Sequence, residues 1–277
     1  MSKVIISLTT IPPRFSLLNA CLKSLLDQTA EISAINVYIP KKYLRFHFDL
    51  DDLPSLPKGV NLRLVEKDIG PATKTLPAVA EYRGADTVII SCDDDRVYDR
   101  NWAQLLIDAS KLRPNHAICT EGFMVSNVDQ FSGGWTSKRT PQFKCFKKDT
   151  HYRLRRALSF GLWKRFELEI EGYADIFEGF GGFLVRPEFF DDAANNIPDI
   201  LWTVDDVWLS GCLERRGVPI WRIRENFLSI NAVKRGLVPS ALGSLVYKGH
   251  GRDSANRLCI DYFKNTYGIW GGTGVHV

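Results

Sequence analysis

Residues 86–95 read DTVIISCDDD, an apolar run that passes directly into three consecutive carboxylates. A short continuous apolar run of this kind is typical of a strand buried on both faces, as in a parallel sheet. In open α/β sheets, ligands bind beyond the carboxyl ends of the strands. Because the acids follow directly on the predicted strand, residues 93–95 are the first candidates for a functional site.

Predicted strands and helices alternate on both sides of this stretch. Residues 4–8 (VIISL) form another apolar run, which residues 9–13 (TTIPP) bring to an end. The same reasoning gives predicted strands at residues 4–8, 35–39, 61–65 and 86–91, and predicted helices at residues 17–26, 71–82 and 101–112. This order predicts an α/β fold with a mostly parallel, open, Rossmann-like sheet and flanking helices.

The composition is that of an ordinary globular protein, with 277 residues, 45% hydrophobic and 25% charged. No linker rich in Pro, Gly or Ser divides the chain, so we expect one domain over residues 1–277. The six cysteines are widely scattered without a C-x-x-C pair, which indicates reduced core thiols. We find neither a signal-peptide pattern nor a run of about 18 apolar residues, and therefore expect a cytoplasmic protein.

The net charge of +4 is too small to indicate a nucleic-acid partner, and none is expected. A local excess of basic residues between positions 138 and 165, interleaved with apolar and aromatic residues, is more informative. Its members are Lys138, Arg139, Lys144, Lys147, Lys148, Arg153, Arg155, Arg156, Lys164 and Arg165. The stretch is either a solvated loop and helix or a peripheral contact with an anionic acceptor or with the inner membrane face.

Three adjacent carboxylates at residues 93–95 raise one another's pKa unless a cation compensates them. In an extended chain, Asp93 and Asp95 point to one side and Asp94 points to the other. Asp93 and Asp95 can therefore share a divalent cation. Mg²⁺ or Mn²⁺ suits such oxygen ligands and keeps positions open for substrate phosphates. The alternative is a solvated turn in which one Asp caps a helix.

A second acid pair, Asp205 and Asp206, opens an apolar segment that is predicted to be helical. The functional interpretation is a general base that accepts the proton of an acceptor hydroxyl. Thr203 with Asp206 three residues later is close to a capping box, so a purely structural role is the alternative. Upstream, the stretch 179–182 contains three glycines, which permit close approach of the backbone to a ligand.

His250 lies between two glycines in the sequence KGHGR of residues 248–252. A histidine in a loop is more often a surface residue than a ligand. The flanking glycines would nevertheless let its ring swing into a site, and neutral imidazole is a good partner for Mn²⁺. Both interpretations stay open at this point.

The order and spacing of these segments resemble the glycosyltransferases of the GT-A type, from about Val4 to His250. Residues 5–14 (IISLTTIPPR) resemble their first strand and nucleotide loop. Residues 25–29 (LLDQT) resemble the end of the first helix in a large inverting family with many bacterial polysaccharide enzymes. Residues 91–95 (SCDDD) resemble the D-x-D metal motif.

Three further segments are similar to β-1,3-galactosyltransferase-like enzymes. Residues 68–76 (DIGPATKTL) resemble the donor-side segment, and residues 179–185 resemble the glycine-rich acceptor loop. Residues 205–207 (DDV) match the E-D-V segment with Asp in place of Glu, which leaves open which acid of the pair is the base.

The resemblance implies metal-dependent, inverting transfer of a sugar from a nucleotide-diphosphate sugar to a hydroxyl acceptor. The implied acceptor is a carbohydrate or a lipid-linked carbohydrate in bacterial surface polysaccharide or lipopolysaccharide synthesis. Residues 1–120 would bind the nucleotide sugar, and residues 121–277 would bind the acceptor. The implied site residues are Asp206 and Asp205 for catalysis, Thr9, Pro12, Arg14, Asp68, Lys74, Asp93 and Asp94 for the donor, and Asp95, Asp93 and His250 for the metal.

We also predict that residues 245–257 form a mobile C-terminal lid, whose His250 reaches the metal only when donor is bound. Gly249 and Gly251 supply backbone freedom for such a motion, and Lys248 and Arg252 carry charge that suits a diphosphate. Closure would exclude water and limit hydrolysis of the donor.

Two other classes of protein compete with this interpretation. A metal-dependent sugar nucleotidyltransferase also uses acids at strand ends, but usually has a glycine-rich basic loop after its first strand, where this chain has residues 9–13 without glycine. A non-catalytic carbohydrate-binding module would use the seven tryptophans, but it needs no cluster of acids suited to a metal.

Overall fold

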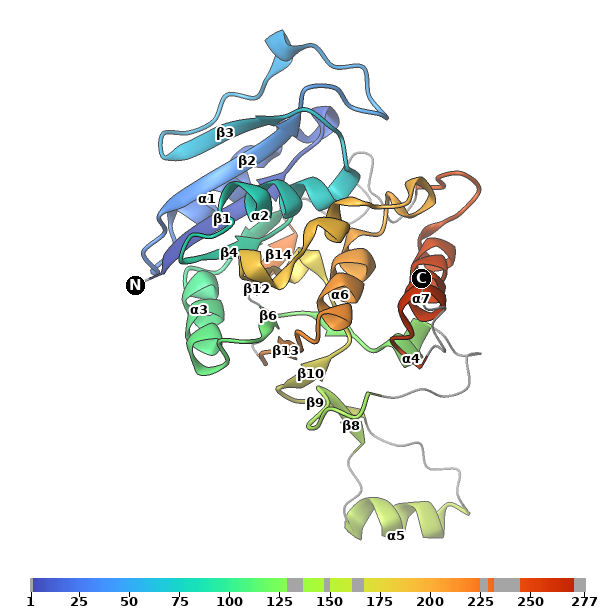
Figure 1. Ribbon diagram of the computed structural model, residues 1–277. Helices are drawn as coiled ribbons and strands as arrows, with labels where there is room; N and C mark the ends of the chain where they lie inside the picture. Colours follow the sequence, from blue (N-terminus) through green and yellow to red (C-terminus); the bar gives the residue numbers. More distant parts are fainter. Residues whose placement is uncertain are drawn as a thin grey trace.

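The computed structural model of the protein describes residues 2–128, 137–146, 150–160, 167–224, 229–231 and 245–271. Its centre is an eight-stranded sheet in the order β10-β13-β6-β12-β4-β1-β2-β3, packed against helices (Figure 1). The strands of this sheet are β1 (Lys3–Thr9), β2 (Ala34–Pro40), β3 (Val60–Val65), β4 (Thr87–Ser91), β6 (Ala117–Cys119), β10 (Gly172–Ala174), β12 (Phe183–Val185) and β13 (Ile220–Arg222).

The helices and the smaller strand pairs lie around this sheet. The α-helices are α1 (Leu18–Leu26), α2 (Leu76–Glu81), α3 (Trp102–Leu112), α4 (Val125–Val128), α5 (Thr150–Leu158), α6 (Asp205–Arg215) and α7 (Arg252–Tyr267). The 3-10 helices are η1 (Pro12–Arg14), η2 (Leu50–Asp52), η3 (Gly70–Lys74), η4 (Gly179–Gly181), η5 (Pro187–Phe189), η6 (Asp192–Asn195) and η7 (Asp199–Leu201). The two-stranded pairs are β5 (Arg96–Tyr98) with β14 (Ser229–Asn231), β7 (Gly122–Phe123) with β11 (Ile176–Phe177), and β8 (Lys144–Phe146) with β9 (Glu167–Glu169).

The first half of the chain forms an all-parallel block, β3-β2-β1-β4. The four strands and two of the three helices predicted there are confirmed within about two residues. The predicted helix at 71–82 is instead split into η3 and α2. Pro77 stands in the first turn of α2, where proline suits a new helix start because its missing N–H has no partner to lose.

The second half adds shorter strands of both directions to the same sheet. β12 inserts antiparallel between β4 and β6, β13 runs parallel to β6, and β10 closes that edge antiparallel to β13. Four of the seven neighbouring pairs are parallel, so the sheet is mixed but mostly parallel. The α/β prediction is confirmed at this level.

Hydrophobic cores lie on both faces of the sheet, because successive side chains of a buried strand point to opposite sides. In β4, Ile90 packs with α1 and α3, whereas Ile89 faces the core shared by α2, α6 and α7. This burial on both faces explains the continuous apolar run that predicted the strand. Five cysteines are free and buried, as predicted, and the side chain of Cys145 lies outside the described residues.

The C-terminal region contains a helix where the sequence suggested a loop or lid. Residues 252–267 form α7, and its Phe263 packs against Trp208 of α6 with ring centroids 5.1 Å apart. Gly211 permits this close crossing, because a Cβ there would lie 2.4 Å from the Phe263 ring. Within the described ranges, no helix is long and apolar enough to cross a membrane.

Candidate active site

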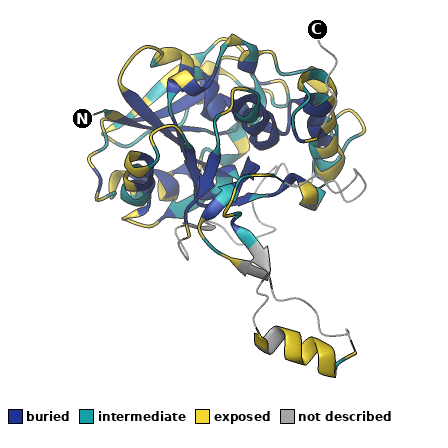
Figure 2. Cartoon of the chain, turned by 60° about the horizontal axis from the view of Figure 1, so that its bottom comes forward, coloured by how far each residue is buried: buried dark blue, intermediate teal, exposed yellow. Residues whose placement is uncertain are grey.

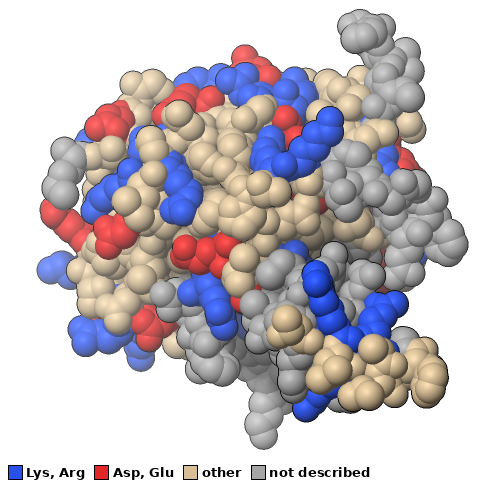
Figure 3. Space-filling model, turned by 90° about the horizontal axis from the view of Figure 1, so that it is seen from below, with Lys and Arg blue, Asp and Glu red and all other residues tan. Residues whose placement is uncertain are grey.

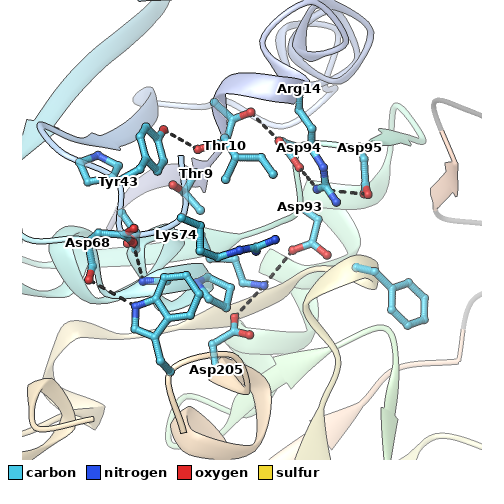
Figure 4. A pocket seen from close by; sticks show the side chains of 18 of the residues that line it. Thr9, Thr10, Arg14, Tyr43, Asp68, Lys74, Asp93, Asp94, Asp95 and Asp205 are labelled. Carbon is cyan, nitrogen blue, oxygen red and sulfur yellow. Dashed lines mark hydrogen bonds and ion pairs between the residues drawn. The ribbon is translucent and has the colours of Figure 1, made fainter. Parts of the chain in front are cut away.

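A pocket of about 470 Å³ opens at the carboxyl ends of β1 and β4 (Figure 4). Nine of the eleven residues that the sequence assigned to the site line it. These are Thr9, Arg14, Asp68, Lys74, Asp93, Asp94, Asp95, Asp205 and Asp206. Acids from the two halves of the chain therefore meet in one cavity.

Sheet topology explains why these distant segments converge. β1 and β4 are parallel neighbours in register at Ser7 and Ser91, so the loops that follow them leave from the same edge. β12 runs the other way, with Phe183 beside Ser91, and this brings the turn η4 before β12 to that edge. The Ser7 hydroxyl donates to the Lys74 carbonyl over 2.6 Å, which fixes η3 to the strand ends.

Arg14 holds the acids at the end of β4. Its Nη1 lies 2.7 Å from Asp94 Oδ1 and 3.4 Å from Asp95 Oδ2. Asp94 also accepts a hydrogen bond of 2.5 Å from the Thr10 hydroxyl. Because Asp94 is only 5% exposed, the alternative of a freely solvated acidic turn does not fit.

Lys74 joins the two groups of acids. Its Nζ lies 2.8 Å from Asp93 Oδ1, 2.9 Å from Asp205 Oδ2 and 3.7 Å from Asp206 Oδ1. Burial alone would lower the pKa of Lys74, but the three carboxylates outweigh it and raise the pKa well above its ordinary value. The same ammonium holds the pKa of Asp93 below its ordinary value, against the opposing effect of burial. Lys74 is therefore a permanent cation between the acids.

Asp206 retains the character of a weak acid. Burial, with the neighbouring Asp205 carboxylate, raises its pKa to about 7. Its Oδ1 accepts a hydrogen bond from the Gly179 backbone N–H over 3.1 Å, and its Oδ2 lies 3.4 Å from Arg252 Nη2. The helix α6 begins after Val204 without a side-chain cap, so the capping role considered for Thr203 and Asp206 is absent.

Asp95 is a second acid of the pocket with a pKa near neutrality. Burial and the charges of Asp93 and Asp94 raise its pKa to about 6. Its side chain is 21% exposed and lines the pocket. It is therefore the strand-end carboxylate whose charge the surrounding cations compensate least.

The pocket contains oxygen ligands of the type that divalent cations take, but they do not form a ready-made cage. Of the described residues that line the pocket, seven are carboxylates and five are Lys or Arg, an excess of two negative charges. In the described part of the chain, no group of three or more His, Cys, Asp or Glu side chains is already arranged around one point. Asp93 and Asp94 instead face Lys74 and Arg14. The carboxylate oxygens of Asp95 and Asp93 are of the hard kind that Mg²⁺ or Mn²⁺ prefers.

A different wall of the pocket is built around Asp68. Both of its oxygens accept backbone hydrogen bonds, from Leu44 over 2.9 Å and from Gly70 over 2.8 Å. Tyr43 donates to the Thr10 carbonyl over 2.8 Å, and Trp202 stands against Gly70, where a Cβ would lie 2.9 Å from its ring. Asp68 thus fixes the shape of this wall by holding its backbone.

Two of the predicted site residues do not line the pocket. Pro12 lies in η1, and His250 is not among the described residues around the cavity. The Nδ1 of His250 forms a hydrogen bond of 2.7 Å with the Ser254 hydroxyl in the first turn of α7. Nearby, Tyr247 donates to Asp199 over 2.8 Å and Lys248 forms an ion pair with the same carboxylate.

The structure also brings to the pocket residues that were not among the eleven assigned site residues. Arg252, which was expected in a lid, reaches Asp206 from the first residue of α7. Glu178 and Trp202 line the cavity from segments without strong periodicity. The only sequence signals were that Glu178 precedes the glycine-rich stretch and that Trp202 precedes the second acid pair.

Compared with models of known protein families, the chain matches none. A search of curated proteins also finds no match. The function of the chain is therefore inferred from the residues of the pocket.

Proposed function

We propose that this protein is a metal-dependent, inverting glycosyltransferase of the GT-A type that uses a nucleotide-diphosphate sugar as donor. One observation carries the proposal. Lys74 links Asp93, at the end of β4, to Asp205 and Asp206, at the start of α6, within a single pocket. A strand-end acid cluster beside an acid with a pKa of about 7 supplies both a place for a metal-bound diphosphate and a general base.

The donor side of the pocket consists of the β1 loop, η3 and the strand-end acids. Arg14 orders Asp94 and Asp95 there, and the nucleoside is proposed to lie along the wall around Asp68, where Tyr43 also lines the pocket. Asp95 and Asp93 would hold Mg²⁺ or Mn²⁺. A bound divalent cation neutralises the diphosphate and stabilises it as a leaving group.

Asp206 is the proposed base, because general acid–base groups work best when their pKa lies near the working pH. Its carboxylate takes the proton of the acceptor hydroxyl while that oxygen forms a bond to the anomeric carbon. The bond from the anomeric carbon to the diphosphate oxygen breaks, and the nucleoside diphosphate leaves with the electron pair. Asp205 keeps Lys74 in place, and Arg252 places a second cation beside Asp206.

The acceptor class follows from the resemblance of residues 179–185 to an acceptor loop. We propose a carbohydrate or lipid-linked carbohydrate hydroxyl in bacterial surface-polysaccharide synthesis. The cytoplasmic location and the mobility of residues 245–257 stay predictions. With His250 paired to Ser254, the geometry favours Arg252 over His250 as the contribution of this region to the site.

The test is a screen of nucleotide-diphosphate sugars with the full chain and Mn²⁺, in which release of nucleoside diphosphate is measured. We expect release from one class of donor, loss of release on chelation, and loss in Asp95→Asn. The control is Asp108→Asn, an exposed acid of α3 that pairs with Lys111. Near-normal turnover of Asp95→Asn with the metal chelated would show that the metal role is wrong.

The same screen separates the competing classes of protein. Release of pyrophosphate in place of nucleoside diphosphate would identify a nucleotidyltransferase. Sugar binding without metal-dependent nucleotide binding, measured by calorimetry with UDP and Mn²⁺, would identify a carbohydrate-binding module.

A further inference from the structure

A short basic helix, α5, stands apart from the body of the molecule. Figures 1 and 2 show α5 projecting beyond β8 and β9, with its described side chains exposed. Residues 150–160 read THYRLRRALSF and include no Asp or Glu. The charged side chains of residues 150–160 are therefore all basic, and none of these residues lines the pocket.

The apolar side chains of this segment are also in water. Leu154 is 60% exposed, Leu158 is 72% exposed, and Phe160, just after the helix, is 97% exposed. Leu154 and Leu158 are four residues apart, so they lie on the same face of the helix. Exposed large apolar groups that gather on one element mark an interaction site more often than scattered ones do.

Three exposed arginines accompany this apolar stripe, namely Arg153, Arg155 and Arg156. With 3.6 residues per turn, they flank the leucine face or oppose it. Figure 3 views this side of the molecule and shows basic side chains beside uncharged atoms on the projecting segment. Lys147, Lys148, Lys164 and Arg165 of the basic stretch lie outside the described residues.

We propose that α5 docks the protein on a membrane surface that contains anionic lipid. Helices that lie in the membrane interface combine an apolar face with arginines that reach the lipid headgroups, and they prefer anionic lipid. An anionic bilayer can bury the leucines in its apolar region and pair its headgroups with the arginines. A nucleic-acid backbone would pair with the arginines and leave Leu154, Leu158 and Phe160 in water. This inference does not depend on the proposed reaction.

The experiment is flotation of the full chain with vesicles of phosphatidylcholine and phosphatidylglycerol in equal parts, and with vesicles of phosphatidylcholine alone. We expect binding to the anionic vesicles only. Replacing Arg153, Arg155 and Arg156 together by Gln should weaken binding about fivefold per arginine, or on the order of a hundredfold in total. Leu154→Gln with Leu158→Gln should also weaken binding at least about tenfold.

Matched controls separate α5 from general surface charge and apolarity. Arg83, Arg100 and Lys111, exposed on other elements, are replaced together by Gln to give the same change in net charge. Leu112→Gln removes a leucine that is 78% exposed on α3. Both controls should keep vesicle binding.

The proposal is overturned if wild type does not bind anionic vesicles, or if the α5 variants bind as well as the controls. It is also overturned if replacing the arginines weakens binding to a nucleic-acid duplex but not to anionic vesicles, and the leucine variant binds the vesicles like wild type.

Discussion

The pocket contains two groups of acids, the strand-end acids at residues 93–95 and the helix-start acids Asp205 and Asp206. In both groups, cations offset the repulsion between neighbouring carboxylates. In each group, a cation compensates a neighbouring acid, the half-buried Arg14 for Asp94 and the buried Lys74 for Asp205. Each group contains one acid with a pKa near neutrality, about 6 for Asp95 and about 7 for Asp206, and burial also raises the pKa of Asp94. Acids with strongly shifted pKa values tend to lie at functional sites. The comparison therefore separates the acids that build the site from the acids that are available for chemistry.

Removing the cation that the two groups share should have the largest effect. Lys74→Met leaves the buried Asp205 and the half-buried Asp93 without their ammonium partner. Loss of one member of a buried ion pair typically costs about 3–5 kcal/mol. We expect that loss in the free energy of urea unfolding at neutral pH, together with loss of donor turnover. The penalty should shrink as the pH falls, because the carboxylates become protonated.

Lys111→Met, in an exposed pair, is the control. Unfolding of Lys74→Met within about 0.5 kcal/mol of wild type would mean that the acids do not need this cation.

Neutralising the helix-start acid should act mainly on catalysis. Asp206→Asn removes the proposed base and should lower kcat about 10²- to 10⁴-fold, with donor affinity nearly unchanged. In wild type, kcat/KM should rise with pH through about 7 as Asp206 loses its proton, and this rise should be absent in the variant. Steady-state kinetics over a pH series measures both. A lower melting temperature with preserved kcat would instead assign Asp206 a structural role.

Neutralising the strand-end acid should give the smallest effect in the metal-free protein. The pKa of Asp95 is raised to about 6 in the folded state, above its unfolded value, so the folded state binds more protons. The contribution of Asp95 to stability should therefore decline as pH rises from about 4 to about 6 and then level off. Asp95→Asn removes this decline and should be more stable than wild type above pH 6 by on the order of 1–2 kcal/mol. Urea unfolding with a chelator, near pH 4 and above pH 6, checks the sign. A destabilised variant at the higher pH would contradict the repulsion that we assign to Asp95.

Most of the strand-end group could be read from the sequence, because an apolar run and the acids that follow it are local signals. The proximity of the strand-end acids to Asp205 and Asp206 could not be derived from such local signals. It depends on the antiparallel insertion of β12, a strand of three residues preceded by glycines and without any periodic signal. Lys74 was assigned by resemblance, and only the folded chain brings its Nζ between the two groups.

The C-terminal helix was missed for a different reason. The glycines at 249 and 251, in a tail rich in Gly, Tyr and basic residues, suggested a loop or lid. Ala255, Cys259 and Phe263 are nevertheless spaced by four residues, and all three are buried in α7. This spacing was a usable helix signal. The side-chain partner of His250 could not be predicted, because it depends on where that helix starts.

The position of β12 also has a consequence for how the chain can be divided. β4 pairs with β1 on one side and with β12 on the other, and β12 comes from more than ninety residues further along the chain. A fragment that ended after the first half would leave β4 as an open edge of apolar sequence, which is a template for aggregation. Folding must therefore wait for a contact between distant segments, which slows it. The segment that leads into β12 also contains Gly179, whose backbone N–H donates a hydrogen bond to Asp206. Adding β12 to the sheet therefore also brings this side of the pocket into place.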